Sequence, residues 1–208
     1  MSQIKSSRRE KAAATRRTIV RAAHAEFVEQ GFHGATVTAI AKRAGVAPQT
    51  VYFVFSNKSA LISAAIDTAV MGEDAPTEPQ LMPWFGAMLA EPDAAESLRI
   101  FVRGSADIFA GAAGLAEVLR AAALTDEEVR RTHLSHERLR EEGFRRVVDM
   151  LAGKGPLCDG LTPKAATDVL LTVLGDSTYH LLTTERGWSH EQVVNWWTDT
   201  LPRLLLAG

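Results

Sequence analysis

The sequence has few of the residues that build covalent frameworks or membrane segments. Its 208 residues include one cysteine, Cys158, which excludes an intramolecular disulfide and a thiolate zinc site and is typical of a reducing compartment. No uncharged apolar stretch approaches the roughly 18–20 residues that span a bilayer. The start, MSQIKSSRREK, lacks the apolar core of a secretory signal. We therefore expect a cytoplasmic protein with no membrane association.

The sequence motifs of several enzyme classes are also absent. The chain contains no HExxH sequence, no glycine-rich phosphate loop and no hydrolase nucleophile motif. His133 and His136 have a spacing that can hold a metal, but four arginines between positions 130 and 140 would repel a cation. We expect no catalytic residues, no metal and no cofactor.

Positive charge is concentrated at the N-terminus. The whole chain has a net charge of −2, yet residues 1–60 contain ten Lys or Arg and three acids, a net charge of +7. Residues 61–208 therefore have a net charge of −9. Such asymmetry indicates either a polyanion-binding segment or a solvated basic helix face. The basic residues Lys5, Arg8, Arg9 and Lys11 leave the same choice open, between a solubilising tail and a DNA-binding arm.

Helical patterns cover most of the chain. From about Arg8 to Gln30, Ile19, Ala23 and Phe27 form an i, i+4, i+8 stripe, and Gly31 ends the helix. Further helices are predicted at 37–44, 48–53, 58–71, 80–90, 94–110, 112–124, 126–152, 163–186 and 190–206, with a loop at 72–80. Capping boxes are predicted at Asp93/Glu96, Thr125/Glu128 and Ser189/Gln192, and Thr162 is predicted to cap the helix that Pro163 opens. Because alternating strand-type runs are absent, the predicted fold class is all-α.

The most informative segment is residues 36–55, TVTAIAKRAGVAPQTVYFVF. Its apolar residues share one face of two short helices: Val37, Ile40, Ala41, Ala44, Val51 and Phe55. Gly45 lies between the helices as a residue able to adopt positive φ, and Pro48 opens the second helix. Two short helices joined by such a turn form a helix-turn-helix, whose second helix enters the major groove of DNA.

Residues at the start of this second helix have chemistry suited to DNA. Gln49 can pair bidentately with adenine, and Thr50 can meet a phosphate or a thymine methyl group. Tyr52 offers a hydroxyl group to phosphate. Ala47 and Pro48 offer apolar contacts, most usefully to thymine methyl groups.

This arrangement resembles the tetracycline-repressor (TetR) family of bacterial transcription regulators. The matching residues are Phe27…Gly31-Phe32, Thr36-Val37-Thr38…Ile40-Ala41…Ala44-Gly45-Val46 and Thr50-Val51-Tyr52…Phe55…Lys58…Leu61. The resemblance covers about the first 65 residues. It implies a homodimer with two N-terminal three-helix, helix-turn-helix heads (residues 1–60) that bind double-stranded DNA. It also implies a helical body (residues 61–208) that binds an effector and dimerises.

The resemblance also implies roles for individual residues. Thr36 would cap its helix and contact phosphate, and Lys58 would contact phosphate through its ammonium group and its helix-terminal amide. The expected DNA-contacting set comprises nine residues: Thr36, Thr38, Arg43, Ala47, Pro48, Gln49, Thr50, Tyr52 and Lys58. The chain departs from the family at Ala47, commonly serine, which removes a capping hydroxyl group. It departs again at Val54, often histidine or tyrosine, which removes a backbone contact.

The predicted body contains many aromatic residues, most of which a helical bundle needs for its core. A subset could line a pocket for a small apolar or amphipathic effector: Trp84, Met88, Phe101, Phe109, Tyr179 and His180. Residues 166–182 and 193–206 are apolar on more than one face, so we expect the last two helices to form a homodimer interface.

The sequence therefore predicts a ligand-responsive regulator, a repressor that an effector releases from a palindromic operator. The alternative is a helical small-molecule-binding protein or enzyme with no nucleic-acid role.

Overall fold

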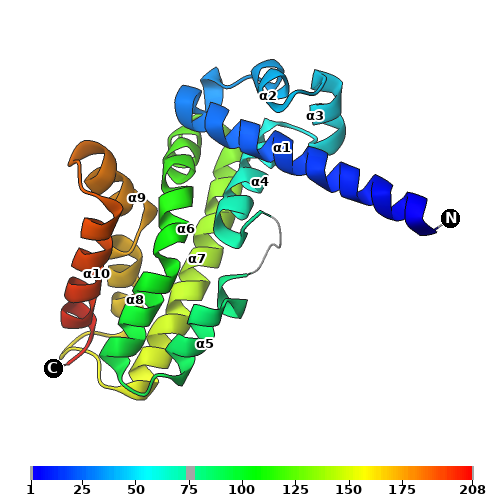
Figure 1. Cartoon of the computed structure of the whole chain (residues 1–208). Helices are drawn as coiled ribbons and strands as arrows, with labels where there is room; N and C mark the ends of the chain where they lie inside the picture. Colours follow the sequence, from blue (N-terminus) through cyan, green and yellow to red (C-terminus); the bar gives the residue numbers. More distant parts are fainter. Residues whose placement is uncertain (1, 74–77, 208) are drawn as a thin grey trace.

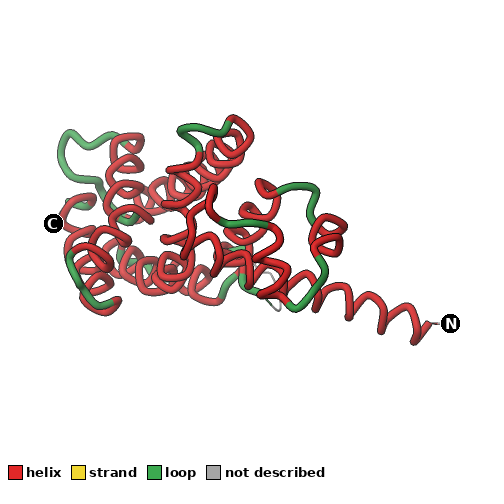
Figure 2. Tube along the Cα trace, turned by 90° about the horizontal axis from the view of Figure 1, so that it is seen from above, coloured by secondary structure: helices red, strands yellow, loops and turns green. Residues whose placement is uncertain are grey.

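The computed structural model describes residues 2–73 and 78–207, and this part of the chain is helical apart from turns and one isolated antiparallel bridge between Leu157 and Leu206 (Figures 1 and 2). The helices are α1 (Ser2–Gly34), α2 (Val37–Ala44), α3 (Pro48–Val54), α4 (Lys58–Met71), the short 3₁₀-helix η1 (Pro79–Leu81), α5 (Pro83–Ala90), α6 (Ala94–Ala122), α7 (Glu127–Lys154), α8 (Pro163–Val173), α9 (Asp176–His180), the π-turn η2 (Leu181–Glu185) and α10 (His190–Leu205). The predicted all-α fold is confirmed. None of these helices is both long enough and apolar enough to cross a bilayer.

The helices form a small head and a longer body. The long helices α6 and α7 run the length of the body, with α5 packed on one side and α8, α9 and α10 on the other (Figure 1). Helices α1, α2 and α3 lie across one end of α6 and α7, and α4 connects them to the body (Figure 1). The N-terminal half of α1 extends past the head (Figures 1 and 2).

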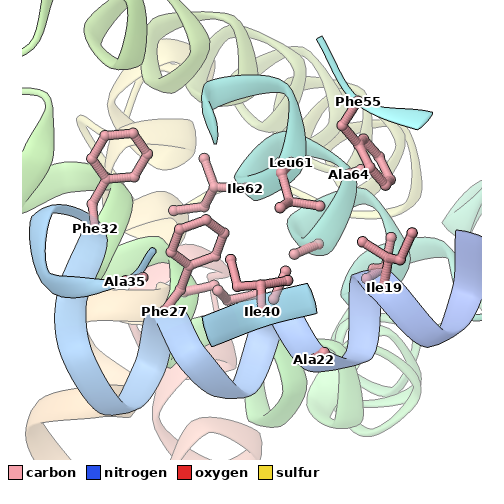
Figure 3. Packing of buried hydrophobic residues seen from close by; sticks show 14 of the residues in the cluster. Ile19, Ala22, Phe27, Phe32, Ala35, Ile40, Phe55, Leu61, Ile62 and Ala64 are labelled. Carbon is pink, nitrogen blue, oxygen red and sulfur yellow. The ribbon is translucent and has the colours of Figure 1, made fainter. Parts of the chain in front are cut away.

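The head is organised around the apolar stripe of α1. Ile19, Ala23 and Phe27 are fully buried, and they pack with Ile40 of α2 and Leu61 of α4 (Figure 3). The same cluster continues into the end of α6 and the start of α7. The core of the head thus includes residues that follow position 60, and the domain boundary that we placed there remains a prediction.

Helix α6 is one continuous helix, so the predicted break between residues 110 and 112 was wrong. Gly111 is helical and marks a close approach rather than an end. A Cβ on Gly111 would lie 3.8 Å from the carbonyl oxygen of Ala69, and a Cβ on Gly114 would lie 3.4 Å from Val28. Small residues in this segment let α4 and α1 pack closely on α6.

The predicted helix at 163–186 is interrupted after Val173. A Cβ on Gly175 would lie 2.6 Å from the carbonyl oxygen of Leu171, so the close turn requires glycine here. Two carbonyl groups that the interruption frees are bonded elsewhere. Thr178 donates to the Thr172 carbonyl at 2.6 Å, and the indole N–H of Trp197 donates to the Val173 carbonyl at 2.7 Å.

The predicted helix starts are mostly correct. Asp93 and Thr162 accept from backbone amides as N-caps, and Ser189 with Gln192 forms a full capping box. The predicted Asp93/Glu96 box is only half formed, because the Asp93 N–H donates to the Glu91 carboxylate and not to Glu96. Thr125 was wrong as a cap, since Asp126 caps α7 by accepting from two amides.

Several helix ends also differ from the prediction. The first helix already begins at Ser2, and it changes direction at Gly31, which has φ 70°. The predicted helix at 80–90 is divided into η1 and α5. Residues 74–77 of the predicted loop lie outside the described residues.

Candidate nucleic-acid interface

Helix α2 is fixed at both ends by the residues that the sequence suggested. The Thr36 hydroxyl group accepts a hydrogen bond from the Ala39 N–H at 3.1 Å. Gly45 adopts left-handed φ and ψ of 68° and 30°, which lets its N–H turn back toward the last carbonyl groups of the helix. The hydroxyl hydrogen of Thr36 can still donate to a phosphate while its oxygen caps the helix.

Helix α3 buries one side and exposes the other. Val51 and Phe55 are buried against the head core. Gln49 is exposed, Thr50 is half-buried, and Tyr52 retains 59% of its surface. The exposed side of a seven-residue helix thus carries an amide, a hydroxyl group and a phenol, all of which can hydrogen-bond to DNA.

Ala47 precedes α3 as its N-cap and supplies no side-chain acceptor. We predict that Ala47→Ser raises the free energy of unfolding by about 0.5–1 kcal/mol, because a serine oxygen can accept from a free amide of the first turn. Urea denaturation followed by circular dichroism measures this change. Ala87→Ser, at an exposed position inside α5, is the control and should not raise the free energy of unfolding. Equal stability of Ala47→Ser and the unaltered protein would contradict the capping argument.

The sequence interpretation missed Phe53, the most exposed large apolar residue of α3. Its side chain retains 92% of its surface. The available signal was its place two residues after Val51, about 200° around a helix from the buried side. An exposed aromatic ring beside Tyr52 extends the outer surface of α3 with a group that can contact thymine methyl groups or deoxyribose.

Two basic residues of the expected DNA-contacting set have partners within the head. Arg43 donates to Glu29, with Nη1 2.7 Å from Oε1, and its Nε lies 3.4 Å from Glu26. Hydrogen bonding from Arg43 lowers the pKa of Glu29 below its usual value. Arg43 therefore joins α2 to α1, and a phosphate contact would compete with this pairing.

The ammonium group of Lys58 points into the head. It donates to the Ala35 carbonyl at 3.1 Å and lies 4.4 Å from the centroid of the Phe32 ring. Partial burial lowers the pKa of Lys58. The first backbone amides of α4, with Asn57 as N-cap, remain the direct route to a phosphate, whereas the side chain must rotate outward to reach one.

Polar contacts join α4 to α7 along one edge. Asn57 donates to Glu128 at 2.6 Å, the hydroxyl groups of Ser59 and Thr132 lie 3.1 Å apart, and Ser63 lies 3.1 Å from Nε2 of His136. We call these three contacts the α4–α7 seam. Hydrogen bonds of this kind depend on alignment, so a small shift of α7 along α4 exchanges partners or breaks the seam.

Two further histidines connect the head to α6 and to the turn that follows it. Nε2 of His24 lies 3.1 Å from the Gly111 carbonyl oxygen, and Nε2 of His33 lies 3.1 Å from the Thr125 hydroxyl group. The head is thus attached to the body by polar contacts at both α1 and α4, in addition to the apolar cluster.

His136 makes the seam sensitive to pH. Burial lowers the pKa of His136 despite Asp67, whose carboxylate lies 3.9 Å away. The folded protein therefore binds a proton here less readily than the unfolded chain, and stability falls as the pH drops below the ordinary histidine range. We predict that His136→Gln loses less stability than the unaltered protein between pH 7.5 and pH 5.5. Urea denaturation at the two pH values tests this, and equal losses would contradict it.

The expected effector residues are placed in two groups within the body. On one side the ring of Trp84 lies 5.9 Å from that of Phe101, and Met88 is fully buried nearby in the same core. On the other side Phe109 and Tyr179 pack on Trp197, with ring centroids 5.3 and 5.8 Å apart. The Trp84 indole N–H is buried with no hydrogen-bond partner among the described residues.

His180, the sixth expected effector residue, is half-buried, and its Nδ1 lies 3.4 Å from the Thr184 hydroxyl group. Asp176, four positions before His180, belongs to an ion-pair group that the sequence interpretation missed. Arg140 of α7 donates to Glu137 at 2.9 Å and to Asp176 at 3.1 Å. Burial raises the pKa of Asp176 even though Arg140 lies beside it. Arg140 and Asp176 are 36 positions apart, so no local pattern could have paired them.

A capped first helix, a left-handed glycine turn and a second helix with an exposed polar side form a helix-turn-helix. Residues 19–65 match the model for bacterial regulatory proteins of the tetR family. The predicted resemblance is thereby confirmed over residues 19–65.

Comparison with a curated relative concerns the same region. The chain is 46% identical over 52 residues to the HTH-type transcriptional regulator UidR of Escherichia coli strain K12. This alignment covers 25% of the chain and 26% of UidR.

Solved structures of similar fold extend over almost the whole chain. FadR of Bacillus subtilis in complex with stearoyl-CoA has a TM-score of 0.69 at 20% identity, covering 88% of this chain and 96% of that one. NalD of Pseudomonas aeruginosa, the secondary repressor of the MexAB-OprM multidrug efflux pump, has a TM-score of 0.67 at 21% identity, covering 95% and 98%. A regulator from Saccharomonospora viridis in complex with choline has a TM-score of 0.65 at 17% identity, covering 93% and 98%.

Proposed function

We propose that the protein is a homodimeric transcription regulator, a repressor that a small apolar or amphipathic effector releases from a palindromic operator. The observation that carries this proposal is the outer side of α3, where Gln49, Tyr52 and Phe53 are exposed on the basic end of an otherwise acidic chain. In this proposal Thr36, Thr38, Ala47, Pro48 and Thr50 complete the contacts with double-stranded DNA.

A homodimer interface formed by the last helices, α8 to α10, is supported by apolar residues that the chain leaves partly uncovered. Most of the apolar surface of these helices is buried within the chain, including Val193, Trp197 and Leu201. Leu181 and Leu204 remain exposed, however, and Trp188 and Trp196 remain half-buried. These residues offer a second copy an apolar surface, and a twofold axis is the usual way to close such a pair.

Release of DNA follows from the attachment of the head to the body. Two heads must be spaced by a multiple of about 34–36 Å to meet successive major grooves. An effector that binds better to a body with shifted α6 and α7 changes the alignment of the α4–α7 seam, and with it the spacing of the heads. Such a ligand lowers DNA affinity by shifting the population toward the mis-spaced state.

The composition of the body supports the proposed effector class. Both groups of expected effector residues are aromatic and apolar, while Arg140, Asp176 and His180 supply polar groups on α7 and α9. A ligand with an apolar portion and a polar end fits this division. FadR of Bacillus subtilis, bound to stearoyl-CoA, is a neighbour with an amphipathic ligand.

Selection of bound fragments from a random DNA pool tests the proposed function. We expect enrichment of a palindrome whose half-sites lie on one face of the duplex, and binding that weakens steeply with salt because phosphate contacts release counterions. Absence of any enriched sequence at moderate salt would contradict the proposal.

A further inference from the structure

We propose that the projecting N-terminal half of α1, residues 2–18, is a DNA-binding arm that runs along the operator flanks and contacts their phosphates. This inference rests on the proposed DNA-binding function and goes beyond the helix-turn-helix. We call this segment the α1 arm. It adds a second, sequence-independent contact surface to each head.

Charge is the first argument for the α1 arm. Residues 2–18 contain Lys5, Arg8, Arg9, Lys11, Arg16 and Arg17 against one acid, Glu10, a net charge of +5. Most of the +7 charge of residues 1–60 is therefore in the α1 arm. The side chains of Arg9, Lys11 and Arg16 are exposed. A duplex, with one negative charge per about 1.7 Å of its axis, is a complementary partner for such a segment.

Helical order is the second argument. The backbone is helical from Ser2, whereas none of the side chains of residues 9–18 is fully buried and the buried stripe of α1 starts at Ile19. The seventeen residues 2–18 span about 25 Å as an α-helix, a length that corresponds to about seven base pairs of duplex. In a flexible tail the basic side chains would have no fixed positions relative to the head. A helix that is continuous with the head fixes the direction in which they extend.

Direction is the third argument. The α1 arm leaves the head on the side away from α8, α9 and α10 (Figures 1 and 2). Because the proposed dimer forms through those last helices, each arm points away from the partner and outward from the centre of the operator. The flanking duplex lies in that direction.

The base of the α1 arm is held beside the C-terminal end of α3. The guanidinium carbon of Arg16 lies 4.4 Å from the centroid of Phe55, which follows α3 and is buried. Positions 5, 8, 9, 12 and 16 lie on one side of a helix together with position 19, the start of the buried stripe. The positions of Lys5, Arg8 and Arg9 therefore continue, beyond the edge of the head, the same helix side that packs under α2 and α4.

The experiment compares three full-length proteins on two duplexes. The proteins are unaltered, the arm variant K5Q/R8Q/R9Q/K11Q, and a control with four exposed α7 arginines replaced, R131Q/R138Q/R145Q/R146Q. The duplexes contain the palindrome recovered by selection, either with about ten base pairs of arbitrary sequence at each end or trimmed to the palindrome. Fluorescence anisotropy at several salt concentrations gives the affinity and its salt slope, and thermal unfolding checks that all three proteins fold.

We expect the unaltered and control proteins to bind the flanked duplex at least tenfold more tightly than the trimmed one. The arm variant should bind both equally. Each lost phosphate contact reduces the salt slope by about 0.9, so two lost contacts in each of two protomers reduce it by about 4.

An arm variant with the affinity and salt slope of the control overturns the inference, and so does an equal loss of affinity on both duplexes. If the unaltered protein enriches no sequence in the selection, the proposed function itself fails. The two failures are therefore distinguishable.

Discussion

Replacing Gln49 and Tyr52 together by alanine should reduce affinity for the selected duplex at least about thirtyfold, because one good base contact contributes about 1–3 kcal/mol and is lost in both heads of the dimer. Both side chains are exposed on α3 and lie outside the head core, so the variant should fold normally. Electrophoretic mobility shift or anisotropy titration measures the loss.

The single variants separate the roles of the two residues. Gln49→Ala should relax the base preference at one position of each half-site, whereas Tyr52→Ala should weaken all sequences alike if its hydroxyl group meets phosphate. Arg138→Ala/Leu139→Ala, on an exposed side of α7, is the matched control and should change affinity less than twofold. A double α3 variant that binds as tightly as this control would refute the assignment of α3 as the reading helix.

Trp197→Ala should lower the free energy of unfolding by about 3–5 kcal/mol, the range for removing a large aromatic side chain from a core. Trp197 is fully buried between Phe109 and Tyr179, and its indole N–H donates to the Val173 carbonyl at the interruption after α8. The substitution therefore leaves a cavity and an unpaired carbonyl group together. Urea denaturation at fixed protein concentration measures the change.

The adjacent Trp196 provides the comparison. It is half-buried, with Trp188 as its aromatic neighbour at 6.0 Å between centroids. Trp196→Ala should leave the fold of each protomer nearly as stable and instead weaken the proposed dimer, which analytical ultracentrifugation detects. Similar losses of unfolding free energy for the two variants would contradict the placement of Trp197 as the internal anchor of α10.

The head could be predicted from sequence because its signals are local. Thr36, Gly45 and Pro48 act within one helical turn of their own positions, and the observed bounds of α2 and α4 are those predicted. The side of α3 that faces outward follows from the period of a single helix and the positions of Val51 and Phe55. Phe53 was overlooked because an aromatic residue two positions from both buried Val51 and buried Phe55 looks like part of the core.

The body could be predicted less well because its decisive contacts join distant residues. The predicted break between residues 110 and 112 is absent, and the Gly111 carbonyl group there meets His24 of α1, 87 positions away. The Val173 carbonyl group that the interruption frees is bonded by Trp197, 24 positions later. Similarly, the Lys154 ammonium group donates to the carbonyl groups of Met88, Leu89 and Glu91 at the end of α5, an arrangement that has no sequence signature although it fixes the end of α7 there.

Two basic side chains, Arg43 and Lys58, are placed differently from what the sequence led us to expect. The resemblance to the TetR family assigns Arg43 and Lys58 to the expected DNA-contacting set. In the structure one is paired with Glu29 and Glu26, and the other with a carbonyl group and a ring. Charge counts could not reveal this, because partner choice depends on how α1 packs against α2 and α4. The exposed residues of α3 and the α1 arm are thus the stronger candidates for contact with DNA.

Chemical footprinting of guanine N7 atoms on the selected palindrome tests the central claim most directly, since these atoms lie in the major groove. If the outer side of α3 reads DNA in two heads, protected guanines should fall in two clusters separated by about 10–10.5 base pairs or a multiple of that spacing. Unprotected N7 atoms throughout a site that the protein demonstrably binds would contradict the account.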